Sequence, residues 1–84
     1  MKNHTKVYMK HFGYGMDEFI PSEVSGSRAT DIHHLVFRSQ GGTDVIDNLI
    51  ELTREEHEQA HKDRSYNEYL KVLHAKKLRV WSDI

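Results

Sequence analysis

The stretch from Asp31 to His61, DIHHLVFRSQGGTDVIDNLIELTREEHEQAH, decides the fold. It opens with a β-like run that ends in His33 and His34, and a turn-rich segment follows at residues 38–44. Asn48 then precedes a short apolar run at residues 49–52, and residues 53–61 favour a helix. We therefore expect two short strands joined by a long loop and followed by a helix.

Two histidines of the expected helix, His57 and His61, are four residues apart. Residues at this spacing lie on one face of a helix, so both imidazoles can reach one metal ion. A third imidazole from the end of the first strand would complete a three-histidine site with an open position. Such a site is of the catalytic type, whereas structural zinc sites are closed by a fourth protein ligand.

The order of these pieces resembles the HNH endonucleases of the ββα-metal nuclease superfamily. The matching pieces are His33 and His34 after Asp31-Ile32, then Gly-Gly-Thr-Asp at residues 41–44, Asn48-Leu49, and the two helical histidines. The resemblance covers about residues 20–62. It implies an α+β fold of the ββα-metal (His-Me finger) type, with a β-hairpin, a long loop, a metal-site helix and an additional C-terminal helix.

The resemblance also implies a role for each residue of the pair His33 and His34. His34 is expected to be the general base that activates water, because the pKa of a histidine lies near neutrality. His33 is expected to bind the metal together with His57 and His61. Neighbouring side chains alternate along a strand, which lets the two histidines take different tasks.

Four further residues have supporting roles in this prediction. Asn48 is expected to hold the loop between the strands and so to orient His34. Asp31 is a candidate partner of a metal-binding histidine, and Arg38 and Arg54 are candidate phosphate contacts.

Many HNH proteins carry a structural zinc on two Cys-x-x-Cys pairs, and this chain keeps the spacing without the cysteines. The corresponding positions are Ser22, Ser25, Thr53 and Glu56. A serine hydroxyl is a poor replacement for a thiolate on zinc. Thr53 and Glu56 instead match a capping box at the start of the metal-site helix. We therefore predict no structural zinc.

One divalent ion per chain is expected at the histidines. Three imidazoles favour zinc, nickel or another late transition ion over magnesium, which prefers oxygen ligands. Manganese and magnesium stay open as the working ion. The chain has no cysteine, so a disulfide framework and a cysteine–zinc site are both excluded.

The length of 84 residues predicts a single domain, residues 1–84. We divide it into an N-terminal extension (1–19), a core (20–62) and a C-terminal helix (64–81). The β-branched and aromatic residues at 6–12 favour a strand. The C-terminal helix is expected to begin near Ser65, which forms a second capping-box match with Glu68.

Burial has to replace the stability that a structural zinc would provide. The C-terminal helix should pack over the core through helically spaced apolar residues: Tyr66, Tyr69, Leu70, Leu73 and Val80. The other expected core residues are Phe19, Ile20, Val24, Ile32, Leu35, Val36, Ile46, Leu49, Ile50 and Leu52.

The net charge is −1, which is not the strongly basic balance of a tight nucleic-acid binder. Residues 41–63 hold two basic and seven acidic side chains, whereas residues 64–84 hold five and two. Affinity for DNA should therefore be modest and salt-sensitive. No apolar run suggests a membrane partner, and a cytoplasmic location is expected, in a bacterial host cell if the gene is phage-borne.

The sequence thus predicts a metal-dependent DNA endonuclease that hydrolyses phosphodiester bonds and nicks one strand per site. The alternative is a catalytically silent DNA- or protein-binding module on the same scaffold. A domain that uses the metal only as a structural staple is a further alternative. A homodimer stays open, as do roles in phage packaging, restriction or mobile elements.

Overall fold

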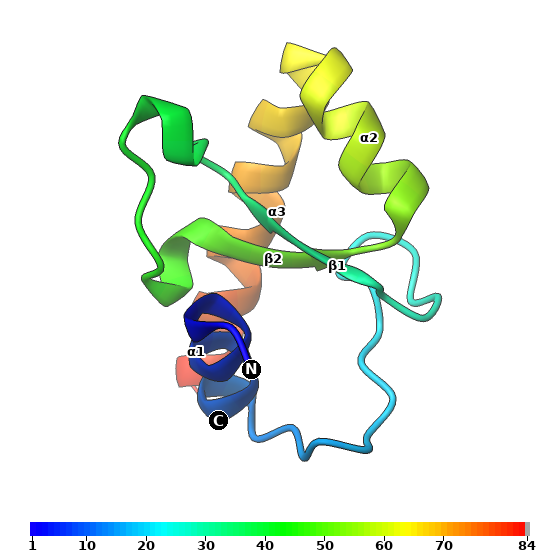
Figure 1. The fold of residues 1–84 in the computed structure, drawn as a ribbon, viewed down its shortest axis with the longest axis vertical. Helices are drawn as coiled ribbons and strands as arrows, with labels where there is room; N and C mark the ends of the chain where they lie inside the picture. The colour runs from blue at the N-terminus through cyan, green and yellow to red at the C-terminus, as the bar shows by residue number, and fades with distance from the viewer. Residues whose placement is uncertain (84) are drawn as a thin grey trace.

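The computed structural model describes residues 1–83 and has an α+β architecture with an antiparallel hairpin at its centre (Figure 1). Strands β1 (Asp31–His34) and β2 (Leu49–Leu52) pair with His33 opposite Ile50 and His34 opposite Leu49. The connecting loop contains two short 3-10 helices, η1 (Arg38–Gln40) and η2 (Ile46–Asn48). The predicted hairpin with a long intervening loop is therefore confirmed.

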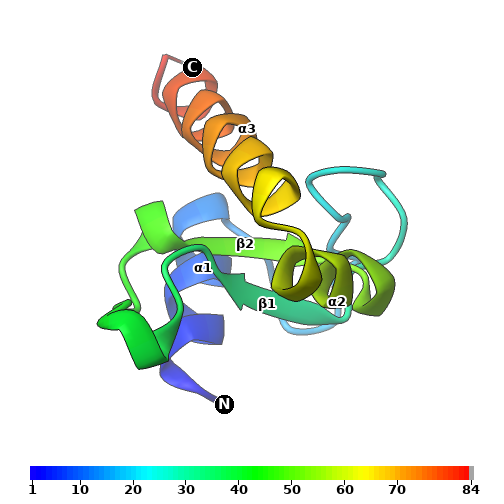
Figure 2. The same ribbon diagram turned by 90° about the horizontal axis from the view of Figure 1, so that it is seen from above.

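Three α-helices surround the hairpin. They are α1 (Asn3–Phe12), α2 (Arg54–Lys62) and α3 (Arg64–Ser82). In Figures 1 and 2, α1 and α2 lie on opposite faces of the hairpin, and the long α3 runs past it next to α2. None of the helices within residues 1–83 is both long and apolar enough to cross a membrane.

Side-chain alternation along the strands divides the core into two clusters. On one side, Leu49 packs with Tyr8 and Phe12 of α1. On the other side, Ile50 and Leu52 pack with residues of the loop, α2 and α3, namely Leu35, Ala60 and Leu70. The same alternation sends His33 and His34 to opposite faces of the hairpin.

The N-terminal segment is a helix, so the predicted strand at residues 6–12 is wrong. Tyr8 and Phe12 are four residues apart and both are buried, which places one face of α1 on the hairpin. Gly13 ends the helix with a positive φ of 75°, and its N–H donates to the carbonyl of Met9. Packing of this helical face outweighs the β propensity of the segment.

The predicted capping box at α2 is confirmed, whereas the one predicted for α3 is wrong. Asp63 caps α3, because its side chain accepts a hydrogen bond from the amide of Tyr66. α2 ends at Lys62, so Asp63 is the single residue between the two helices. Ser65 therefore already lies inside α3 and is exposed.

Most of the expected core residues are buried or partly buried. Four are exposed instead, with at least two fifths of their surface in contact with solvent: Phe19, Val36, Tyr69 and Val80. Tyr69 and Val80 lie on the side of α3 that faces away from the two clusters, because Asn67, Leu70 and His74 take the buried side. Phe19 and Val36 lie on irregular segments where no periodicity predicts burial.

A buried ion pair joins α1, the segment before β1, and α3. His74 Nδ1 lies 2.9 Å from Glu23 Oε1, and Tyr8 donates to Glu23 Oε2 at 2.6 Å. His74 Nε2 also donates to the carbonyl of Ile46, at 2.7 Å. Burial lowers the pKa of His74, but the hydrogen bonds to Glu23 and Ile46 outweigh it and raise the pKa above its usual value. This contact fixes η2, the turn that leads to Asn48.

Candidate functional site

Three histidines converge beside the hairpin, as the sequence predicts. His33 comes from β1, and His57 and His61 come from α2. One ring nitrogen of each lies within 4.8 Å of those of the other two, which is close enough for a single metal ion to bind all three. The structure therefore holds a histidine cluster that could bind a metal.

The tautomer of His33 follows from its contact with α3. Asn67 Nδ2 donates to the carbonyl of Leu35 at 3.0 Å, which directs Asn67 Oδ1 towards His33 Nε2 at 2.7 Å. His33 Nε2 must then carry the proton, and Nδ1 keeps its lone pair. Nδ1 is the one buried side-chain nitrogen or oxygen among residues 1–83 that has no hydrogen-bond partner. A metal ion on Nδ1 would satisfy it.

His57 is oriented by Asp31, the predicted partner of a metal-binding histidine. Asp31 Oδ2 lies 2.9 Å from His57 Nδ1 and also accepts a bond from Arg54 Nε at 2.9 Å. Burial raises the pKa of Asp31, but the hydrogen bonds from His57 and Arg54 outweigh it and lower the pKa. An ionised Asp31 keeps the proton of neutral His57 on Nδ1, so the Nε2 lone pair is free for a metal.

The spacing of the two helical histidines suits a common ligand. His57 Nε2 and His61 Nε2 are 3.2 Å apart. Two nitrogens bound tetrahedrally to one zinc ion are about 3.3 Å apart. Burial, with the neighbouring His57 and His61, also lowers the pKa of His33 to about 4, despite the opposing bond to Asn67. His33 is therefore neutral near pH 7, as a metal ligand must be.

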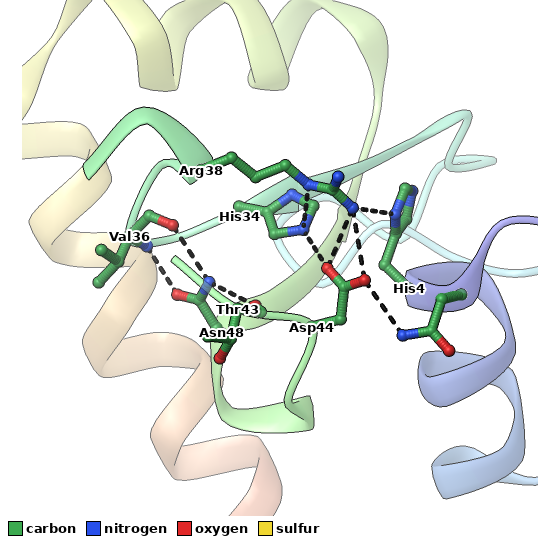
Figure 3. Close-up of polar contacts among 8 residues, drawn as sticks. His4, His34, Val36, Arg38, Thr43, Asp44 and Asn48 are labelled. Atoms are coloured by element: carbon green, nitrogen blue, oxygen red, sulfur yellow. Dashed lines mark hydrogen bonds and ion pairs between the residues drawn. The ribbon is translucent and has the colours of Figure 1, made fainter. Parts of the chain in front are cut away.

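His34 lies on the other face of the hairpin, in a second polar cluster (Figure 3). Its Nε2 is 2.8 Å from Asp44 Oδ1. Arg38 Nη2 donates to the same carboxylate oxygen at 3.1 Å and lies 3.2 Å from His4 Nδ1. The ring of His4, from α1, meets the ring of His34 edge-on with centroids 5.1 Å apart. His34 is thus packed between the hairpin loop and α1.

His4, His34 and Asp44 also come close enough together to bind a cation. The guanidinium of Arg38 already contacts all three of these side chains. Hydrogen bonds, first from His34 and then from Asn3, lower the pKa of Asp44 to about 2. The cation of this cluster is therefore Arg38, and we do not assign a second metal site to it.

Asn48 closes the loop as predicted. Its Oδ1 accepts from the amide of Val36 at 2.7 Å, and its Nδ2 donates to the carbonyls of Val36 and Thr43 (Figure 3). Gly42 leaves room for this contact, since a Cβ there would lie 1.7 Å from the carbonyl oxygen of Val36. Asn48 thus ties together the two ends of the loop that carries Arg38 and Asp44.

A hollow of about 300 Å³ joins the two clusters. The metal-binding candidates and His34 both border it, so a bound group could touch both. Its lining residues are Lys2, His4, Ile32, His33, His34, Phe37, Arg38, His57 and His61.

Hydrogen bonds around Glu56 link Ser22, Ser25 and Thr53, the positions at which the sequence predicts no structural zinc. Glu56 Oε1 accepts from the hydroxyl of Ser22 and from the amide of Thr53, and Thr53 Oγ1 accepts from the amide of Glu56. Ser22 Oγ in turn accepts from the amides of Val24 and Ser25. Burial raises the pKa of Glu56, but these bonds outweigh it and lower the pKa. A hydrogen-bonded carboxylate network thus joins these four residues at the start of α2.

The structure brings together all the residues that the sequence singled out for the metal and the base. Arg38 and Arg54, the candidate phosphate contacts, are ion-paired with Asp44 and Asp31 but are largely exposed, at 61% and 68% of their side-chain surface. Three partners are not predicted by the sequence pattern: His4, Asn67, and Asp44 as the partner of His34. Asp44 could have been found from its place in the Gly-Gly-Thr-Asp motif, whereas nothing in the spacing points to Asn67 or His4.

Comparison with known proteins adds no relative to this description. No protein-family model, no curated protein and no solved structure matches the chain.

Proposed function

We propose that the protein is a metal-dependent DNA endonuclease with an HNH-type ββα-metal site. The observation that carries the proposal is the unpartnered, buried Nδ1 of His33, in a ring that lies against the rings of His57 and His61, with His34 at the next position of the strand. A general binding module needs neither a buried, unpartnered ring nitrogen within a histidine cluster nor a fourth histidine beside it. The resemblance of the sequence to HNH endonucleases supports the same proposal.

His33, His57 and His61 would hold the metal through the lone pairs that Asn67 and Asp31 leave free. A divalent ion bound there supplies a Lewis acid that neutralises charge on the phosphate and on the leaving oxygen. The hydrogen bonds to Asn67 and Asp31 fix two of the three rings before the ion arrives, which lowers the cost of ordering them.

His34 acts as the general base. It takes one proton from a water molecule whose oxygen bonds to phosphorus, while the bond between phosphorus and the 3′ oxygen breaks. The products are a 5′-phosphate and, after the leaving oxygen takes a proton from solvent, a 3′-hydroxyl. Asn48 keeps the loop in the conformation that places Arg38 and Asp44 beside His34.

Arg38 and Arg54 are the proposed contacts to flanking phosphates, because both side chains are largely exposed: Arg38 borders the hollow, and Arg54 pairs with Asp31, the partner of His57. A small number of such contacts implies modest affinity with a shallow salt dependence. One site per chain cuts one strand, so we expect nicked DNA as the first product.

Supercoiled plasmid tests the proposal. Incubation with the protein and Mg²⁺, Mn²⁺, Ni²⁺ or Zn²⁺ should convert supercoiled circles to nicked circles with at least one ion, and EDTA should stop the reaction. His33→Ala should abolish nicking. His11→Ala, an exposed histidine on α1 outside both clusters, is the matched control and should cleave normally.

Failure of the parent protein to nick DNA with all four ions would contradict the proposal. Metal-dependent gain of thermal stability without cleavage would then favour the structural staple. DNA binding that is unchanged by EDTA and by His33→Ala would favour the silent binding module.

A further inference from the structure

The second polar cluster contains a carboxylate–imidazole pair that the proposed reaction has not yet used. His34 Nε2 and Asp44 Oδ1 are 2.8 Å apart, and both side chains are largely shielded, with 12% and 22% of their surface exposed. Asp44 lies ten residues after His34, in the loop that Asn48 closes. A hydrogen bond of this length to an ionised carboxylate determines where the imidazole proton sits.

Two neighbours compete for His34 Nε2, and they require opposite protonation of this atom. Arg38 Nε can only donate, and it lies 3.3 Å away. The carboxylate of Asp44 can only accept, and it is closer. The shorter contact prevails, so Nε2 carries the proton and Nδ1 holds the lone pair.

We propose that Asp44 is a positioning residue for the general base: it holds His34 in the Nε2–H tautomer and leaves Nδ1 to accept the proton of water. The inference rests on the proposed nuclease function for its catalytic meaning. The arrangement corresponds to the aspartate of a Ser-His-Asp triad, which holds the imidazole in one tautomer and stabilises the imidazolium without taking the proton. Asp44 likewise remains ionised while His34 gains a proton and later releases it to solvent.

The carboxylate of Asp44 is itself held by donors from two directions. Asn3 Nδ2 donates to Oδ2 at 3.1 Å. Arg38 Nη2 donates to Oδ1 at 3.1 Å (Figure 3). Asn3 is the first residue of α1, so the N-terminal extension contributes to the site. An anchored carboxylate keeps the imidazole plane fixed, which an isolated loop aspartate would not do.

Ring nitrogen NMR on the full chain tests the tautomer directly. Long-range ¹H–¹⁵N spectra at about pH 8.5, where free imidazole is neutral, should show the proton of His34 on Nε2 and an unprotonated Nδ1. Assignment uses the signals lost in His34→Ala. Asp44→Asn should shift the population towards Nδ1–H, because the Asn amide can donate to Nε2.

Asp47→Asn is the matched control, since it removes the same charge from an exposed position of the same loop. It should leave the His34 signals unchanged. In the plasmid assay Asp44→Asn should lower the nicking rate by at least about 100-fold, as expected when the base is held in the wrong tautomer, and Asp47→Asn should have little effect. Zinc titration should give the same midpoint for both variants, because Asp44 lies on the face opposite the metal-binding candidates.

An Nδ1–H tautomer in the parent protein would overturn the inference, as would unchanged ring signals in Asp44→Asn. If the parent protein fails to nick DNA, the nuclease proposal falls, and the ring spectra still decide whether Asp44 sets the tautomer. If Asp44→Asn is unfolded by circular dichroism, the parent spectrum decides the same question.

Discussion

Ser22 donates a hydrogen bond from its hydroxyl to Oε1 of Glu56, which lies 34 residues further along the chain. The contact joins the segment before β1 to the first turn of α2. A shared carboxylate thus links the segment before β1 to the start of the helix that carries His57 and His61.

Removal of the Ser22 hydroxyl should destabilise the domain. A hydrogen bond to a charged group is worth about 2 kcal/mol, so Ser22→Ala should lower the free energy of unfolding by about this amount. Urea denaturation without metal measures it. Ser27→Ala is the control, because Ser27 is exposed and contributes its backbone carbonyl to the same segment. An equal loss of unfolding free energy in the two variants would show that the Ser22–Glu56 hydrogen bond does not stabilise the domain.

Loss of the N-cap should connect helix stability to metal affinity. Thr53→Ala removes the bond to the amide of Glu56 and should lower apo stability by about 1 kcal/mol. Fraying of the first turn would move His57, so metal affinity should fall and high metal concentration should restore most of the cleavage. The nicking rate against metal concentration checks this, and an unchanged metal midpoint would disprove it.

The division between His33 and His34 predicts different losses. His34→Ala should abolish nicking at every metal concentration and leave metal affinity nearly intact, because its side chain lies on the opposite face of the hairpin. His33→Ala should lose both the nicking activity and the metal affinity. Calorimetric metal titration separates the two, and a much weaker metal affinity for His34→Ala would show that His34 is itself a ligand.

The hydrogen-bonded network around Glu56 predicts a limit on metal content. The folded protein should bind at most one transition ion per chain tightly, and His33→Ala should remove it. Elemental analysis after desalting measures the content. Two ions per chain would place a second site at Ser22, Ser25, Thr53 and Glu56 or at the Asp44 cluster.

Glu51 predicts a pH dependence of stability. Its side chain is 6% exposed on β2, and burial, with the nearby charges of Asp31 and Glu23, raises its pKa to about 7. In the unfolded chain its pKa returns to 4.5, so the folded state binds more protons between pH 4.5 and 7. Stability from this group is therefore present at low pH and is lost as the pH rises through about 7.

Glu51→Gln should remove this loss. Since one pKa unit corresponds to about 1.4 kcal/mol, the variant should be more stable than the parent by about 3 kcal/mol at pH 8 and much less changed near pH 5. Two cationic residues, Arg54 and Lys2, line a surface hollow together with Glu51. Arg54, however, is already hydrogen-bonded to Asp31. Thermal melts across this range measure the effect, with the exposed Glu58→Gln as the control. Parallel curves for Glu51→Gln and the parent would refute the prediction.

The sequence by itself determined the hairpin, the helix that carries His57 and His61 with its cap, and the set of histidines that come together. These features depend on local periodicity: alternation along a strand separates His33 from His34, and a four-residue spacing aligns His57 with His61. Only the tertiary structure decided the state of each ring. Asn67 and Asp31 select the lone pairs of His33 and His57, and Asp44 contacts His34, yet none of these partners is fixed by local periodicity.

The N-terminal helix illustrates the same limit. Tyr8 and Phe12 form a buried face only because β2 presents Leu49 to them, and that packing outweighs the local preference for a strand. The consequence reaches the site, since α1 places Asn3 against Asp44 and His4 against His34. Contacts between segments distant in the chain depend on complementary surfaces, which local propensity does not encode. Periodicity therefore predicted which histidines come together. Packing against distant segments decided which of their ring nitrogens keep a lone pair.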